Sequence, residues 1–419
     1  MKGLPMGLGQ ILSLKEASMF EEFIYNFTHN LFKPLLLFFY LGFLVPLLKV
    51  PFEFPHVLYK GLTIYLLIAI GWHGGEELAS LSLAELEHAL GFMVIGFFTN
   101  LVIGIAAYLV LRQTRLRQID AATVAGYYGS DSAGTFVTCL GVLAAANIAF
   151  AAYMPVLLAV MEIPGCLVAL YIVSRLRASG KLDVLGNMPG EPGYDPYARK
   201  PVVSVSEGED DHVEHEKPRQ VPMAAAQSLG AAAAADYPSS HSIFNKKVLH
   251  EIFLNPGLYL LFGGILIGFI GRLQGVKVTE VDDRFFVALF HGILSLFLLE
   301  MGMTASRRLQ DLTHAGPSFI LFGLIAPNIF AAFGIVVAHG YSMFLGVPFE
   351  LGTYALFAVL CGAASYIAVP AVQRLAIPEA SPTLPLAASL GLTFSYNVTI
   401  GIPVYIMIAT AITRAMPVG

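Results

Sequence analysis

Apolar stretches long enough to cross a lipid bilayer follow one another along most of this chain, and they limit its possible folds more than any other feature. A helix needs about 20 residues to span the hydrocarbon core. Hydrophobic residues make up 56% of the 419 positions and charged residues only 13%, and the mean hydropathy is +0.71. This composition excludes an ordinary soluble domain and predicts an all-α polytopic membrane protein.

About ten stretches have the length and composition of transmembrane helices. The predicted spans are residues 31–49, 57–75, 88–111, 120–146, 150–174, 253–271, 285–305, 316–340, 351–377 and 384–413. The first 30 residues contain "SLKEASMFEEFIYNF" and are interpreted as an interfacial segment, because they lack the pattern of a removable signal peptide. The sequence therefore predicts residues 1–30 as an N-terminal segment, 31–175 and 248–419 as two five-helix units, and 176–247 as a central loop.

Lys and Arg residues gather on alternate loops of this predicted topology. The positive-inside rule then places both termini outside the cytoplasm and the central loop inside it. This loop contains the acidic run "EGEDDHVEHE" and the low-complexity stretch "AAAQSLGAAAAAD". Such a composition predicts a largely disordered segment, which serves either as a flexible tether or as a docking element for a cytoplasmic regulator.

The two predicted units share markers at matching places. Asn100 corresponds to Asn328, and Pro164 corresponds to Pro403. Between these markers each unit holds one glycine-interrupted apolar stretch, "AGYYGSDSAGTF" in the first and "LCGAASYIAVPAV" in the second. Because five helices is an odd number, the two copies must have opposite topologies. Inverted repeats with broken helices, here the fourth and the ninth, are typical of secondary transporters, whose sites lie where the breaks meet.

The predicted break in the fourth helix contains glycines and short hydroxyl side chains around one carboxylate. Glycine permits nonhelical backbone, and hydroxyl groups satisfy the backbone groups that a break frees. Freed helix N-termini favour anions, and freed carbonyls favour Na+. The candidate substrate-binding residues are Gly129, Ser130, Ser132, Gly134 and Thr135, with Ser365 and Tyr366 opposite.

Asp131 is the most informative residue of this break. An aspartate at the centre of a membrane helix costs about 2.5–3.5 kcal/mol on insertion scales, so it requires a partner or a cavity. Asp131 either caps the next half-helix, or it holds Na+ or cycles a proton. The candidate sodium-binding residues are Asp131, Ser132, Glu162, Asn397 and Thr399. For Glu162, a structural hydrogen bond to a freed carbonyl is an equal alternative.

The order of "GYYGSDSAGT", "MEIPG", "MGM" at 301–303 and "LAIPEASP" at 375–382 resembles the sodium-dependent bicarbonate transporter family known from cyanobacteria. The resemblance covers nearly the whole chain after residue 30. It implies a fold related to sodium/proton antiporters and bile-acid symporters, assembled as a homotrimer in the bacterial plasma membrane. It also implies a bicarbonate and Na+ site where the fourth and ninth helices cross, and a cytoplasmic PII-like regulator. The second break departs from the family, because Tyr366 stands where the family has aspartate.

Three functions are compatible with these features. The first is Na+-coupled symport of bicarbonate or a similar small anion into the cell. The second is Na+/H+ antiport through Asp131, and the third is a membrane sensor or scaffold without transport. An enzyme is not expected, because no serine has an evident His partner and no metal-ligand spacing occurs. Membrane lipid is an expected contact, whereas no feature indicates a nucleic-acid partner.

Overall fold

A computed structural model describes residues 32–197, 254, 256–311, 316–366 and 368–418. Within these ranges the regular secondary structure consists of helices, and no strand occurs. Seven helical segments are long and apolar enough to cross a membrane, and two shorter ones are also apolar. The prediction of an all-α polytopic membrane protein is confirmed, while the count of ten spans and the inverted repeat stay predictions. The N-terminal segment 1–30 lies outside the described residues.

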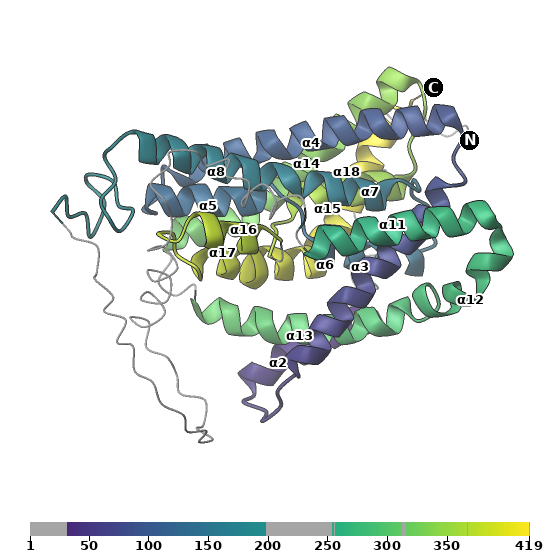
Figure 1. The fold of residues 1–419 in the computed structure, drawn as a ribbon, viewed down its shortest axis with the longest axis horizontal. Helices are drawn as coiled ribbons and strands as arrows, with labels where there is room; N and C mark the ends of the chain where they lie inside the picture. Colours follow the sequence, from purple (N-terminus) through teal and green to yellow (C-terminus); the bar gives the residue numbers. More distant parts are fainter. Residues whose placement is uncertain (1–31, 198–253, 255, 312–315, 367, 419) are drawn as a thin grey trace, which may run out of the picture.

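The helices run roughly along one common direction, with several steeply crossing ones at the side of the bundle (Figure 1). In the first half they are α2 (Pro34–Leu47), α3 (His56–Leu78), α4 (Leu83–Leu111), α5 (Gln118–Tyr128), α6 (Ala133–Ala145), α7 (Met154–Met161) and α8 (Ile163–Ala178). In the second half they are α11 (Pro256–Gln274), α12 (Val276–Phe286), α13 (Phe290–Asp311), α14 (Pro317–Leu345), α15 (Leu351–Gly362), α16 (Ala368–Ala376), α17 (Leu384–Leu386), η2 (Ala387–Phe394), η3 (Asn397–Gly401) and α18 (Ile402–Ala415).

Both stretches that the sequence predicts as broken helices are interrupted. The span expected at 120–146 divides into α5 and α6, and the span expected at 351–377 divides into α15 and α16. Residues 352–362 of α15 are buried, as are residues 119–128 of α5. These two half-helices therefore form the centre of the molecule, and α4, α8, α14 and α18 pack around them. The outer helices α2, α4, α11 and α14 instead expose large apolar side chains, as lipid-facing surfaces do.

Glycines allow α11 to pack closely against α3. A Cβ on Gly264 would lie 2.7 Å from the Ile68 carbonyl oxygen and 3.1 Å from the Cα of Gly71. Gly268 similarly faces the backbone of Trp72. Gly264 and Gly268 therefore let the backbones of α3 and α11 approach each other closely.

Three regions differ from the sequence-based boundaries. The fifth span divides at Glu162 into α7 and α8, and the last span contains the π-helical segments η2 and η3. The central loop also begins differently, because α8 continues to Ala178 and residues 179–197 form hydrogen-bonded turns. In these turns Asp183 accepts hydrogen bonds from the backbone N–H groups of Leu185, Asn187 and Asp195. The first part of the predicted loop therefore forms turns, while residues 198–247, on which the prediction of a largely disordered loop depends, lie outside the described residues.

Candidate functional site

The first break lies between two half-helices: one residue caps the end of the first, and another caps the beginning of the second. α5 ends at Tyr128, and the N–H of its C-cap residue Gly129 donates to the Ala125 carbonyl at 2.8 Å. α6 begins after Ser132, whose hydroxyl accepts hydrogen bonds from the Thr135 N–H at 3.3 Å and from the Thr135 hydroxyl at 2.9 Å. Ser132 thus caps α6, so the alternative that Asp131 serves as this cap is wrong.

Two glycines of the break permit close approach of neighbouring chains. A Cβ on Gly129 would lie 2.8 Å from the Cα of Gly104 in α4, which is closer than real Cβ atoms come. Gly134, in the first turn of α6, lies directly against the hydroxyl of Tyr366. The glycines therefore bring the first break against α4 on one side and against the second break on the other.

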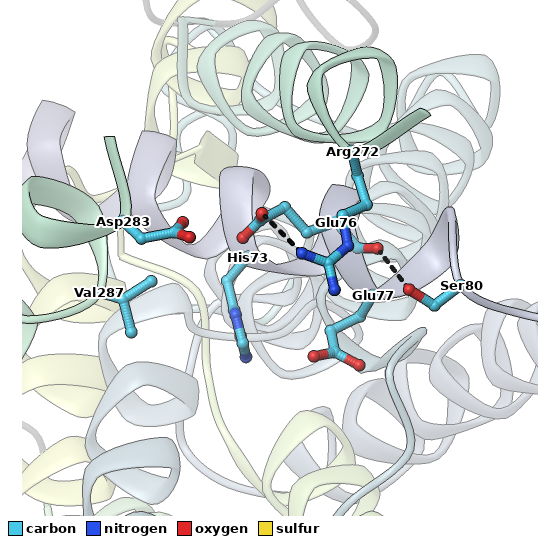
Figure 2. Close-up of a pocket in the computed structure, with 7 residues that line it drawn as sticks. All are labelled: His73, Glu76, Glu77, Ser80, Arg272, Asp283 and Val287. Atoms are coloured by element: carbon cyan, nitrogen blue, oxygen red, sulfur yellow. Dashed lines mark hydrogen bonds and ion pairs between the residues drawn. The ribbon is translucent and has the colours of Figure 1, made fainter. Parts of the chain in front are cut away.

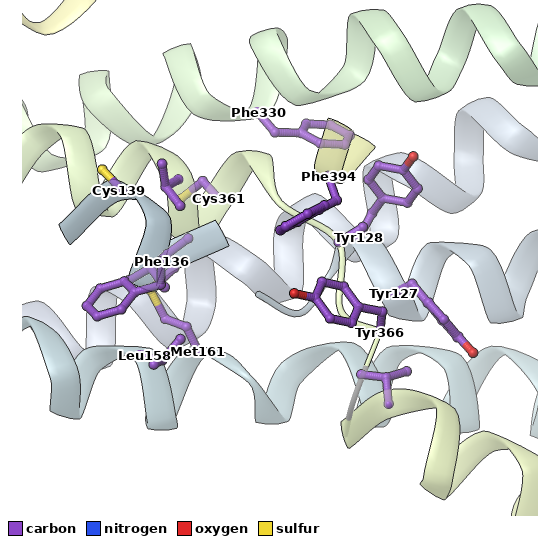
Figure 3. Packing of buried hydrophobic residues seen from close by; sticks show 14 of the residues in the cluster. Tyr127, Tyr128, Phe136, Cys139, Leu158, Met161, Phe330, Cys361, Tyr366 and Phe394 are labelled. Carbon is purple, nitrogen blue, oxygen red and sulfur yellow. The ribbon is translucent and has the colours of Figure 1, made fainter. Parts of the chain in front are cut away.

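The second break lies between Gly362 and Ala368 and is hydrogen-bonded to the first. The Ser365 N–H donates to the Tyr127 carbonyl at 2.9 Å, so the chain between α15 and α16 is tied to the last turn of α5. Tyr366 packs edge-to-face on Phe394, with 5.5 Å between ring centroids, and its buried hydroxyl has no hydrogen-bond partner (Figure 3). The structure therefore brings residues 129–135 together with Ser365 and Tyr366, as the sequence predicts.

Asp131 lies between the two half-helices of the first break and is fully buried. Neither of its carboxylate oxygens has a hydrogen-bond partner. It also takes part in none of the ion pairs found in the described part of the chain. The ionisable groups within electrostatic range of Asp131 include Glu162 and Cys361. A carboxylate without partners is costly in such a place, and a proton or a cation would offset the cost.

Glu162 lies at the junction of α7 and α8, on the other side of the same break. Its carbonyl accepts a hydrogen bond from the Ser130 hydroxyl at 2.9 Å, and the neighbouring Met161 carbonyl accepts one from the Asn100 side chain at 2.9 Å. These bonds satisfy backbone groups at the junction and tie it to the break and to α4. They leave the Glu162 carboxylate available to act together with Asp131.

The two candidate ligands on the last span differ in position. Asn397 is buried and donates to the Gly362 carbonyl at 2.9 Å, while its own oxygen accepts from the Tyr405 hydroxyl at 2.6 Å. It supports the end of α15, and its carbonyl oxygen is already bonded. The Thr399 hydroxyl donates to the Ser395 carbonyl of its own helix at 2.7 Å, and no hydrogen bond connects it to either break.

Sequence reasoning missed two residues that belong to this region. Gln373 of α16 is buried, and its side-chain amide donates to the Thr123 carbonyl of α5 at 3.0 Å. A single amide side chain within the apolar stretch "AVPAVQRLA" is the signal that would have indicated it. Cys361, which the sequence assigns only to the core, is buried near the end of α15 and lies within electrostatic range of Asp131. No comparable sequence signal marks this cysteine.

The crossing of the two breaks offers sites for both signs of charge. The C-terminal ends of α5 and α15 present carbonyl oxygens, and the N-terminal ends of α6 and α16 present N–H groups. The described residues contain no group of three or more His, Cys, Asp or Glu side chains that would hold a metal ion. A cation held here would therefore combine the Asp131 carboxylate with hydroxyl and carbonyl oxygens, which suits Na+ better than a transition metal.

An all-helical membrane protein with two broken helices crossing around a buried, unpaired carboxylate has the architecture of a secondary transporter. The sequence profile of the Na+-dependent bicarbonate transporter superfamily matches residues 34–410. The chain belongs to this family, and the resemblance seen in its motifs is confirmed. A search among curated individual proteins finds no match.

Proposed function

We propose that the protein is a secondary active transporter that couples entry of Na+ to entry of bicarbonate or a similar small anion. The observation that carries this proposal is Asp131, which is fully buried and has no partner for either carboxylate oxygen. Family membership supports Na+ and an anion as the transported species. An enzymatic function is not proposed, since the family is one of transporters.

Asp131 and Glu162 are the proposed carboxylates of the cation site. A Na+ ion beside Asp131 would neutralise a charge that the protein leaves unpaired, and Ser132 would contribute a hydroxyl oxygen. Asn397 and Thr399 would act from further away, since their hydrogen bonds hold the ends and turns of neighbouring helices. Binding of the transported Na+ is therefore expected to depend most on Asp131.

The anion is proposed to bind at the N-terminal ends of α6 and α16. Helix N-termini carry a partial positive charge and unpaired N–H groups. Gly129 and Gly134 keep the backbone accessible, and Ser130, Thr135 and Ser365 supply short polar groups. The Tyr366 hydroxyl, which has no partner of its own, is a donor ready for an anion. Moving one negative charge inward costs about 2.3 kcal/mol per 100 mV, and one Na+ entering with it cancels this cost.

Uptake of labelled bicarbonate into proteoliposomes, with and without an inward Na+ gradient, tests the proposal. The wild type should accumulate label only with the gradient, and Asp131→Asn should remove this dependence. Asp282→Asn is the matched control, because Asp282 is exposed on α12 and far from the breaks in sequence. Retention of Na+-dependent uptake by the Asp131 variant would contradict the assignment.

Na+/H+ antiport is the second candidate, and the proximity of Glu162 to Asp131 favours it. Two neighbouring carboxyl groups can exchange a proton for a cation without any anion. In anion-free proteoliposomes an imposed Na+ gradient would then change the internal pH. Symport predicts no pH change in these vesicles, whereas antiport predicts one that Asp131→Asn abolishes. A sensor or scaffold would show neither activity.

The oligomeric state, the membrane location and the orientation of the termini are part of the same proposal. We infer a multi-pass protein of the bacterial plasma membrane with both termini outside, a homotrimer, and a PII-like regulator at the central loop. The alternation of basic loops supports the orientation, and the family resemblance supports the other inferences. Native mass spectrometry of the purified protein would test the trimer, and labelling of single cysteines at the termini would test the orientation.

A further inference from the structure

A polar hollow lies between α3, α11 and α12, away from the crossing of the breaks. It has a volume of about 210 Å³. The lining residues are His73, Glu76, Glu77, Ser80, Arg272, Asp283 and Val287 (Figure 2). The last turns of α3 and α11 and the whole of α12 lie at the end of the molecule opposite the end of α8 (Figure 1). In the topology proposed above, this is the outer end.

One face of α3 supplies most of the polar wall. Glu76 and Glu77 follow His73 by three and four residues, so the three side chains project from the same side of the helix, and Ser80 follows in the turn after α3. Arg272 enters from the last turn of α11, and Asp283 enters from α12. With three carboxylates and one guanidinium, the hollow carries an excess of negative charge.

Glu76 is the buried member of this cluster. It is 8% exposed, and its Oε1 atom has no hydrogen-bond partner. The nearest guanidinium nitrogen, Nη1 of Arg272, is 4.0 Å from this oxygen, which is longer than a hydrogen bond. Arg272 therefore attracts Glu76 but leaves its Oε1 atom unbonded, and the Glu76 side chain is one of those that line the hollow (Figure 2).

Asp283 adds a second carboxylate at a fixed position. Its Oδ1 atom accepts a hydrogen bond from the indole N–H of Trp72 at 2.9 Å. Asp283 also lies within electrostatic range of Glu76, and among the residues that line the hollow Arg272 is the one Lys or Arg side chain, with His73 the other basic residue. Two neighbouring carboxylates that share one distant guanidinium are left with uncompensated negative charge, and a cation would offset it.

We propose that this hollow binds a small monovalent cation, Na+, in partly hydrated form. Carboxylate and hydroxyl oxygens are the ligands that hard cations prefer. A water molecule occupies about 30 Å³ of liquid volume, so the space admits the ion together with several waters. The described residues provide no cluster of three or more His, Cys, Asp or Glu side chains suited to a metal ion.

The proposed ion would connect three elements. Glu76 belongs to α3, Arg272 to α11 and Asp283 to α12, so a cation between the carboxylates holds α12 against the other two helices. Without the ion, α12 is held by the Tyr65 hydroxyl, which donates to the Phe285 carbonyl, by ring contacts of Phe285 and Phe286 with Tyr65 and Trp72, and by Thr279 against Gly271. Bound Na+ should therefore slow local opening of α12, in proportion to its occupancy.

Hydrogen exchange of the full-length protein in lipid nanodiscs tests this site. The experiment compares NaCl with choline chloride at equal ionic strength, in an Asp131→Asn background that removes the proposed central cation site. Exchange of residues 276–287 should slow saturably with Na+, by about tenfold when Na+ is about nine times its dissociation constant. Hydrogen exchange measures opening of α12 and not transport, so the result is independent of whether the proposed symport is correct.

Three substitutions give the decisive comparison. Glu76→Gln and Asp283→Asn should each abolish the effect of Na+, and the second variant keeps an oxygen that accepts the Trp72 N–H. Glu280→Gln is the matched control, since Glu280 lies on the same helix, pairs with Arg284 at 3.8 Å and does not line the hollow. The control should respond to Na+ like its parent. A Na+ effect that survives Asp283→Asn, or protection by Ca2+ at lower concentrations than by Na+, would overturn the proposal.

Discussion

Two buried aspartates on the same broken span have opposite surroundings. Asp120, at the beginning of α5, receives hydrogen bonds from the Arg117 guanidinium at 2.6 and 2.9 Å and from the Ser381 N–H at 2.7 Å. Asp131, just after the end of α5, has no partner for either oxygen. The first carboxylate joins the beginning of α5 to the segment between α16 and α17, whereas the second is left ready for an ion.

This contrast separates a structural charge from a functional one. A buried carboxylate whose lone pairs are all used stabilises the elements that supply the donors. A buried carboxylate without donors stabilises nothing in the protein and must gain its partner from outside. Substitution of the two aspartates should therefore damage different properties.

The largest effect is expected on transport by Asp131→Asn. Removing the carboxylate from a cation site should lower Na+-dependent uptake about 10- to 100-fold, because a contact to a charged group contributes about 1.5–3 kcal/mol. Thermal unfolding should be unchanged or occur at a higher temperature, since no protein hydrogen bond is lost. Initial uptake rates and unfolding curves of the same preparation measure both quantities. If Asp131→Asn lost stability but kept its uptake, Asp131 would have the structural role that is assigned to Asp120.

Asp120→Asn should show the opposite pattern. It leaves the Arg117 guanidinium without its carboxylate in a half-buried position, which should lower the free energy of unfolding by about 1–3 kcal/mol. Uptake per folded molecule should stay close to that of the wild type. Chemical unfolding followed by the fluorescence of Trp72 measures the change. Equal stability of Asp120→Asn and the exposed control Asp282→Asn would refute the structural role.

A smaller effect is expected at the ion pair between Arg177 and Glu379. The pair joins the end of α8 to the loop after α16 at 2.7 Å, but the arginine side chain is 36% exposed. Solvent and salt screen such a pair, so its coupling energy should be below about 1 kcal/mol. A double-mutant cycle with Arg177→Gln and Glu379→Gln measures this coupling. A coupling energy as large as the stability loss of Asp120→Asn would show that solvent exposure does not determine how much each ion pair contributes to stability.

The smallest effect concerns Asp183 in the turns after α8. Burial opposes ionisation of this carboxyl, but hydrogen bonds from the N–H groups of Asn187, Asp195 and Leu185 and from the Asn187 side chain outweigh it and hold its pKa below the usual value. The stabilisation is therefore present above the unfolded-state pKa of about 3.9 and is lost as the pH falls through the lower folded-state pKa. Amide exchange at residues 185–195, corrected for its intrinsic pH dependence, should accelerate below about pH 4. Asp183→Asn should remove most of this pH dependence.

Local patterns along the chain predicted both breaks well. Glycine and hydroxyl residues between two apolar runs indicated where α5 and α15 end, because the bilayer forces unpaired backbone groups to find partners nearby. The roles of single residues were harder to predict. Ser132 rather than Asp131 caps α6, and the Asn397 carbonyl oxygen is already bonded to Tyr405. Both outcomes depend on which of several neighbouring polar groups has the right geometry, and spacing alone does not determine this.

The sequence by itself determined the membrane class, the places of the two interruptions and the family, because these follow from the length of apolar runs and the order of short motifs. Only the tertiary structure decided which charges are partnered. Asp120 finds its donor in Ser381, which is 261 positions away, while Asp131 finds none. The physical reason is that hydrogen bonds act over about 3 Å, so the partners of a buried carboxylate depend on helices that meet only in the folded chain.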